Sequence, residues 1–149
     1  MSLRNPPSSS THGRILLVDD NANGLSARKS VLEELGHRIS AARSAADALE
    51  HFAQQRYDLV VTDYKMPHMD GLELIKQIRK LSPEMPIVLL SGYVDALGLN
   101  EGSTGADAVI QKSANEVSHL LRAVSRLLRK KPARKSAASE LPKSKRKAV

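Results

Sequence analysis

The sequence predicts an α/β protein, a doubly wound sheet of five parallel strands with five helices on its two faces. Two observations support this fold class. Short apolar segments of strand length recur five times, and the segments between them carry apolar residues at helical spacing. Most of the strand segments lack polar alternation, which is typical of parallel strands that are buried on both faces.

The five predicted strands follow one another along the chain. They lie at residues 15–18, 37–42, 59–62, 87–90 and 108–110. The second is the most polar and is predicted to be an edge strand. Because connections between parallel strands are right-handed, a strand and a helix repeated five times give a doubly wound sheet. Ligands of such sheets bind outside the carboxyl ends of the strands.

Four of the five predicted helices have a clear apolar face and a local signal at one end. The end signals are Gly36 after the first helix, Ser44 before the second, Pro83 after the third, and a capping box of Ser113 and Glu116 before the last. Arg28 falls on the apolar face of the first helix, between Leu25 and Leu32. Between residues 93 and 105, glycines interrupt the helical pattern, so a short or mobile helix is expected there.

The basic charge of the chain is concentrated at its carboxyl end. The formal net charge is +7, and residues 129–149 contain nine basic residues and one acidic residue, so residues 1–128 are near neutral. We expect a disordered leader at 1–13, one domain at 14–128 and a disordered basic tail at 129–149. The tail is too short for a DNA-binding domain, although its charge suits non-specific binding of a polyanion.

Composition excludes several classes of protein. The chain contains no cysteine, which excludes disulfides, thiolate catalysis and cysteine-ligated zinc. The leader lacks the apolar segment of a secretory signal. No segment approaches the roughly 20 apolar residues that a transmembrane helix needs. A cytoplasmic protein is the expectation.

Three carboxylates follow two of the predicted strands directly. Asp19 and Asp20 come after the first strand, and Asp63 comes after the third. If these strands are neighbours, the three acids meet at one edge of the sheet. Two carboxylates about 4 Å apart repel by roughly 4 kcal/mol at an effective dielectric constant of about 20, so such a cluster favours a bound cation or a protonated member. Hard oxygen ligands indicate magnesium.

The same edge gains a hydroxyl group and a cation. Ser91 follows the fourth strand, and Lys112 follows the fifth. Acids, magnesium, a hydroxyl group and a lysine together can accept and hold a phosphoryl group by positioning and electrostatic stabilisation. Each residue has an ordinary reading as a helix cap, a turn residue or a solvated charge. Their joint placement at successive strand ends favours the functional interpretation.

At residues 60–71 the sequence resembles the bacterial response regulator receiver family. The segment reads Val-Val-Thr-Asp-Tyr-Lys-Met-Pro-His-Met-Asp-Gly, which is similar to the family's phospho-acceptor strand and the loop behind it. The resemblance covers roughly residues 14–128 and includes the spacing from Asp20 to Asp63, Ser91 and Lys112. It implies a flavodoxin-like, CheY-like fold in a stand-alone, chemotaxis-type receiver.

The resemblance also implies a metal site. Asp20 and Asp63 would ligate Mg²⁺ together with the backbone carbonyl of Lys65, and Asp19 would act through water. Asp63 would accept the phosphoryl group from a sensor histidine kinase or a phosphotransfer protein. The protein would then be a two-component phosphoprotein rather than an enzyme, with self-catalysed phosphorylation and dephosphorylation only.

Two further roles follow from the same resemblance. Ser91 would bind a phosphoryl oxygen and draw its loop inward, and Lys112 would pair first with the acceptor carboxylate and then with the phosphoryl group. The phosphorylated form would signal to a downstream protein through a conformational change. The sequence does not name that protein.

The chain departs from the family pattern at two positions. Val109 stands where receivers commonly carry an aromatic switch residue, and Ser113 stands where they commonly carry a proline with a cis peptide bond. A cis bond without proline costs about 2.5–4 kcal/mol, so a trans bond or a strained one is predicted after Lys112. Tyr93, two residues after Ser91, is a candidate for the missing ring.

Two other functions compete with the receiver interpretation. These departures are compatible with a pseudo-receiver that binds proteins without phosphoryl turnover. A phosphatase of the haloacid-dehalogenase type would place its nucleophile on the first strand with a second Asp two residues later. The segment from Asp19 to Ala22 does not supply that pair.

Overall fold

The predicted sheet is present. A computed structural model describes residues 12–139, with side chains described to residue 130. The five strands are β1 (Arg14–Val18), β2 (Arg38–Ala42), β3 (Leu59–Asp63), β4 (Ile87–Ser91) and β5 (Ala108–Gln111). All pair in parallel in the order β2-β1-β3-β4-β5, which confirms the predicted doubly wound α/β fold with β2 at an edge.

Six helices accompany the sheet in the described part of the chain. They are α1 (Ala22–Glu34), α2 (Ala45–Gln54), α3 (Gly71–Leu81), α4 (Val94–Leu97), α5 (Glu101–Thr104) and α6 (Glu116–Ser139). The interrupted helix expected between residues 93 and 105 is therefore two short helices, which are followed by Gly98 and Gly105. This is why the described residues contain six helices where the sequence predicted five.

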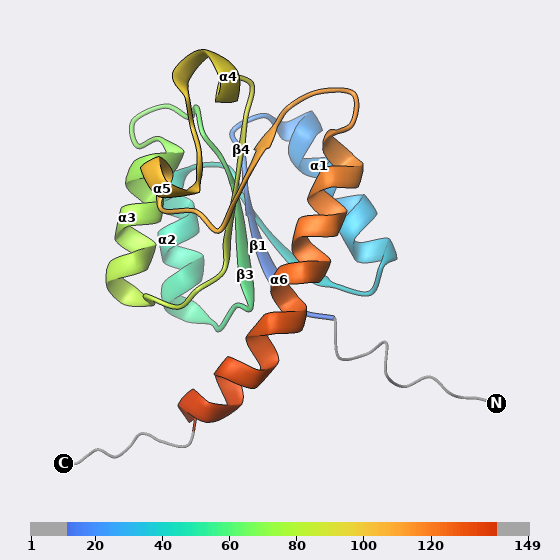
Figure 1. The fold of residues 1–149 in the computed structure, drawn as a ribbon, viewed down its shortest axis with the longest axis vertical. Helices are drawn as coiled ribbons and strands as arrows, with labels where there is room; N and C mark the ends of the chain where they lie inside the picture. Colours follow the sequence, from blue (N-terminus) through green and yellow to red (C-terminus); the bar gives the residue numbers. More distant parts are fainter. Residues whose placement is uncertain (1–11, 140–149) are drawn as a thin grey trace.

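The sheet separates two hydrophobic layers. Figure 1 shows α1 and α6 on one face and α2 and α3 on the other. Strand alternation divides the side chains between the two layers: Ile15 and Leu17 pack with α1 and α6, whereas Leu16 and Val18 pack with α2 and α3. The sheet thus splits the hydrophobic core into two compartments.

Side-chain caps fix the starts of α1, α2 and α3. The Asn21 side chain accepts from the backbone N–H of Gly24 at the start of α1, and Asp70 caps α3. The predicted Ser44 cap is present, since its hydroxyl accepts from Asp47 N at 3.0 Å. Each cap satisfies a backbone donor that the first helical turn leaves without a partner.

The predicted capping box before the last helix does not form. Ser113 Oγ accepts from the backbone N–H of Asn115 instead, at 3.2 Å. The carboxylate of Glu116 points elsewhere, to Arg28 on α1. A buried charge partner therefore outweighs the local backbone contact that the sequence pattern suggested.

The boundaries of the domain also differ from those expected. The basic tail was predicted to be disordered from residue 129, yet α6 continues through Pro132 to Ser139. Proline removes one backbone donor from a helix, whereas the Ala, Lys and Arg residues around it favour helix. At the other end, Gly13 belongs to the fold rather than to the leader, because its carbonyl accepts from Arg38 N at 2.9 Å.

Residues 1–11 and 140–149 lie outside the described residues, and so does most of what was predicted for the leader and the end of the tail. Within residues 12–139, none of the helices has the length and apolar character that crossing a bilayer would require.

Candidate functional site

The predicted site residues meet at the carboxyl ends of the strands. The strand order reverses between β1 and β3, and this switch point is where such sheets bind ligands. Val18 pairs with Thr62, so the next residues, Asp19 and Asp63, face each other across the sheet edge. Beside them lies a pocket of about 700 Å³, lined by residues that include Asp20, Asp63, Lys65, Ser91 and Lys112.

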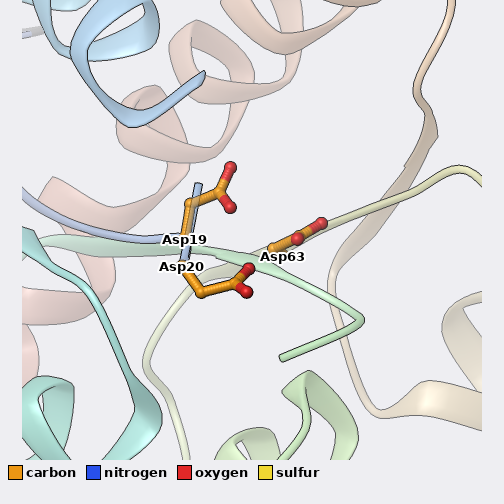
Figure 2. A group of neighbouring side chains, drawn as sticks. All are labelled: Asp19, Asp20 and Asp63. Carbon is orange, nitrogen blue, oxygen red and sulfur yellow. The ribbon is translucent and has the colours of Figure 1, made fainter. Parts of the chain in front are cut away.

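The three acids form one cluster. Each of Asp19, Asp20 and Asp63 offers a carboxylate oxygen within 4.8 Å of the others, and Figure 2 shows them converging from the ends of β1 and β3. Asp19 is 1% exposed and Asp63 is 5% exposed. Burial, to which the neighbouring charge of Asp19 adds, raises the pKa of Asp63 in spite of the opposing effects of Lys112 and Arg28. The cluster therefore has the charge and ligand type of a divalent-cation site.

A lysine reaches the acid cluster from the fifth strand. Lys112 Nζ lies 2.7 Å from Asp63 Oδ1, as the sequence predicted for these two residues. The backbone of Lys112 is held in turn, since its N–H donates to the carbonyl of Ser91 at 2.9 Å. Lys112 therefore opposes the negative charge of Asp63 directly.

The hydroxyl group from β4 is buried beside the pocket. Ser91 is 1% exposed, and its Oγ accepts from the backbone N–H of Tyr93 at 2.9 Å. A hydroxyl can accept and donate at the same time, so Ser91 can also donate to an oxygen in the pocket. Val109 packs against the α2–α3 layer, and no peptide bond within residues 12–139 is cis, as predicted for Lys112 and Ser113.

Lys65 and Tyr93 line the pocket, and Tyr64 packs against Tyr93. Lys65 Nζ lies 5.2 Å from the centre of the Tyr93 ring, at cation–π distance. The rings of Tyr64 and Tyr93 meet edge to face, with centroids 6.4 Å apart. Tyr93 is 42% exposed, so its ring lies at the rim rather than in the core.

The glycine of the loop motif has a steric reason. A Cβ atom on Gly71 would lie 2.3 Å from the backbone oxygen of Asp63, closer than real contacts allow. Gly71 N also donates to the carbonyl of Tyr64 at 2.7 Å. The absence of a side chain thus lets α3 begin directly against the end of β3, which fixes the position of Asp63.

One site residue was not assigned from the sequence. Arg28 Nη1 lies 2.5 Å from Asp19 Oδ2, and Arg28 is 8% exposed. The signal was present as a charged residue on the apolar face of α1, because buried arginines are rare unless they are paired. Its partner could not be identified from the sequence, since Asp19 had been assigned to the acid cluster of the pocket.

The fold and the pocket define a class: flavodoxin-like proteins with a cluster of acids at the switch point and a lysine from the last strand. A sequence profile described as the response regulator receiver domain matches residues 15–125. The chain therefore belongs to the response regulator receiver domain family of two-component systems.

Curated relatives agree with this assignment. The transcriptional regulatory protein ZraR of Escherichia coli is 34% identical over 79 residues, which cover 53% of this chain and 18% of ZraR. The gliding motility regulatory protein of Myxococcus xanthus is 30% identical over 117 residues, covering 76% of this chain and 15% of that protein. The chain thus spans less than a fifth of the length of these two relatives.

Solved structures share the fold over most of the chain. A CheY-like receiver domain protein from Methanospirillum hungatei is 31% identical with a TM-score of 0.74, covering 81% of this chain and 97% of that one. The response regulator protein TrrA from Thermotoga maritima, solved in complex with Mg²⁺-BeF, is 36% identical with a TM-score of 0.68, covering 76% and 97% of the two chains.

Proposed function

We propose that this protein accepts a phosphoryl group on Asp63 from a phosphohistidine of a sensor kinase or a phosphotransfer protein. The observation that carries the proposal is the 2.7 Å pair between Lys112 Nζ and Asp63 Oδ1, placed within a cluster of three buried or partly buried acids. In the transfer, a carboxylate oxygen of Asp63 forms a bond to phosphorus and the phosphorus–nitrogen bond of the donor histidine breaks. The donor leaves as neutral histidine once it has taken up a proton.

The residues of the pocket fit a magnesium ion. Asp20 and Asp63 would supply carboxylate oxygens, the backbone carbonyl of Lys65 would be a further ligand, and Asp19 would act through water. This donor set contains hard oxygens only, which is the preference of Mg²⁺. When bound, the ion neutralises the acids and the charge of the incoming phosphoryl group.

The other residues of the pocket hold the product. Lys112 moves from the carboxylate of Asp63 to a phosphoryl oxygen, because the negative charge then lies on the phosphoryl oxygens and no longer on the carboxylate. Ser91 donates its hydroxyl to a second phosphoryl oxygen. The resulting displacement of the β4–α4 and β5–α6 loops changes the surface formed by α4, β5 and α6, which we propose as the face that a downstream partner reads.

The protein is proposed to act by self-catalysed phosphorylation and dephosphorylation, without turnover of a separate substrate. Intact mass spectrometry after incubation with Mg²⁺ and a small-molecule phosphodonor tests this, with Asp63→Ala as the control. A single phosphoryl adduct is expected that requires both Asp63 and the metal.

The same experiment can overturn the proposal. If a folded protein that binds Mg²⁺ takes up no phosphoryl group from the small donor or from a panel of histidine kinases, the pseudo-receiver function is the better description. Rapid release of phosphate from many added substrates would instead indicate a phosphatase.

A further inference from the structure

Arg28 joins two acids from opposite ends of the chain. Its Nη1 donates to Asp19 Oδ2 at 2.5 Å, and its Nε donates to Glu116 Oε2 at 2.6 Å. Asp19 belongs to the acid cluster, whereas Glu116 is the first residue of α6, 88 positions after Arg28. One guanidinium group therefore connects the pocket to the start of the last helix.

This connection is shielded from solvent. The side chain of Arg28 is 9% exposed, and those of Asp19 and Glu116 are 2% and 14% exposed. Figure 1 shows α1 and α6 side by side on one face of the sheet, with Arg28 carried by α1. Charges in such a position are screened far less than surface pairs, so each influences the others strongly.

The helix leaves room for this pair. A Cβ atom on Gly24, one turn before Arg28, would lie 3.2 Å from Arg28 Nη1 and 3.2 Å from Asp19 Oδ2. Both distances are tighter than ordinary van der Waals contact. The absence of a side chain at Gly24 is thus matched to the guanidinium group and its carboxylate partner.

Asp19 cannot engage the pocket without affecting Arg28. Its Oδ1 accepts from the backbone N–H of Asn21 at 2.9 Å, and its Oδ2 is taken by Arg28. A divalent cation in the cluster repels the guanidinium group and competes for the charge of Asp19. Arg28 has a second partner already within reach, because Glu116 lies on its other side.

We propose that Arg28 is a positioning residue that couples occupancy of the acidic pocket to the first turn of α6. In the structure, Arg28 is shared between Asp19 and Glu116. A cation in the pocket, bound alone or together with a phosphoryl group, repels the guanidinium group toward Glu116, and the start of α6 becomes more firmly held. This route does not require an aromatic switch residue, and the chain has Val109 where receivers commonly carry one.

For the phosphorylated state, the inference rests on the proposed function. The experiment with magnesium alone does not depend on phosphorylation. Magnesium is titrated into the wild-type protein, Glu116→Gln and Arg28→Gln, with the affinity measured by calorimetry and the amide exchange of α6 by mass spectrometry. Arg79→Gln serves as a matched control, because Arg79 also holds an acid, Asp107, at 3.0 Å but does not line the pocket.

The two variants are expected to behave differently. In the wild type, saturating Mg²⁺ slows exchange in the first turn of α6. Glu116→Gln binds Mg²⁺ within about twofold of the wild type but loses this slowing, since the contact to α6 is broken. Arg28→Gln binds Mg²⁺ at least about fivefold more tightly, because a competing positive charge beside Asp19 is gone. Arg79→Gln matches the wild type in both measurements.

Arg28→Lys keeps the experiment decisive if Arg28→Gln does not fold. A lysine retains the charge but lacks the planar fork that holds two carboxylates. It is expected to restore the wild-type affinity for Mg²⁺ without restoring the slowing in α6. If Arg28 only stabilised the fold, these variants would change neither the affinity for Mg²⁺ nor the effect of Mg²⁺ on exchange in α6, when compared under conditions of equal stability.

Three results would overturn the inference. One is slowing in Glu116→Gln equal to that in the wild type. Another is Arg28→Gln that folds and binds Mg²⁺ no more tightly than the wild type. The last is exchange in α6 of the wild type that stays the same with Mg²⁺ and with a beryllofluoride phosphoryl mimic. Failure of the proposed function is a separate outcome, because it appears as a missing adduct on Asp63 while the coupling to α6 remains.

Discussion

The two halves of the pocket are built differently. The half at β1 and β3 is rigid, since Asp19 and Asp63 are buried and Gly71 packs directly against the backbone of Asp63. The half at β4 and β5 is open. Gly92 has no atom within 4 Å of where its Cβ would be, and the short helices α4 and α5 follow it.

In the proposed function, this difference separates the binding of a phosphoryl group from the response to it. The rigid half carries the acids, which need fixed positions to bind a cation and to present a nucleophile. The open half carries Ser91 and Lys112, which the proposed function requires to move once Asp63 is phosphorylated. The departures from the family pattern, Val109 and Ser113, also lie on the open half. The response is therefore the part of the mechanism in which this chain differs.

The largest effect is expected from Lys112→Gln, which removes the contact between the two halves and should lower the rate of phosphorylation. Lys112→Gln removes the only cation from the open half that contacts Asp63 among the described ion pairs. Phosphorylation by a small-molecule donor is expected to slow by about 100-fold, the usual loss when one stabilising group is removed. The rate is measured by intact mass, with Lys76→Gln on the exposed side of α3 as the control. A rate within about threefold of the wild type would contradict this role for Lys112.

A pair of glycine substitutions compares the rigidity of the two halves directly. Gly71→Ala places a Cβ atom against the backbone of Asp63 and is expected to cost about 1–3 kcal/mol in the free energy of unfolding. Gly92→Ala meets open space and is expected to change stability by less than about 0.5 kcal/mol. Urea denaturation measures both. Equal losses in the two variants would show that the halves do not differ in this way.

Tyr93 tests whether the rim of the open half shields the pocket. Tyr93→Ala removes the ring that meets Lys65 and Tyr64, and an exposed cation–π contact contributes about 0.5–1 kcal/mol. The lifetime of the phosphoryl group on Asp63 is expected to shorten by about two- to fivefold, because water reaches the pocket more easily. Tyr93→Phe keeps the ring and should behave like the wild type. An unchanged lifetime and unchanged partner binding in Tyr93→Ala would remove Tyr93 from the mechanism.

The smallest effect is expected far from both halves, at His37. Burial, and then the nearby His12, lowers the pKa of His37, whose Nδ1 accepts from Gly13 N at 3.1 Å. The folded state thus favours neutral His37, so its contribution to stability is complete above the ordinary pKa of the unfolded chain and is lost as the pH falls below it. Stability is expected to fall slightly from about pH 7.5 to about pH 5.5, and less so in His37→Asn.

Denaturation at several pH values measures this difference. The same phosphorylation rate in His37→Asn as in the wild type would confirm that the fold alone is affected. An identical loss of stability in both proteins would show that other groups cause it.

Much of the site was predictable because it depends on strand ends. Periodicity located the strands, and parallel pairing brings the residues that follow them to one edge. Asp63 and Lys112 were predicted as a pair and lie 2.7 Å apart. The topology brings these two residues to one edge of the sheet, and their pairing is what the resemblance to the receiver family implies.

The contacts of Arg28 were not predictable in the same way. Its partner Glu116 is 88 positions away, and the local pattern around Glu116 favoured a capping box instead. The end of α6 was missed for a related reason: Pro132 is a strong local signal, and the helix-favouring residues around it were given too little weight. Local patterns predict elements well but do not rank a local contact against a distant one.

The position of the pocket on the sheet has a further consequence. Along β1 and β3, Asp19 and Asp63 continue the rows of Leu17 and Val61, which belong to the α1–α6 layer. Ser91 continues the row of Leu89, which belongs to the α2–α3 layer. A sheet normally separates the side chains on its two faces, but here residues that continue both layers meet at the same pocket. A small group bound at this edge would therefore contact residues that continue both layers of the core.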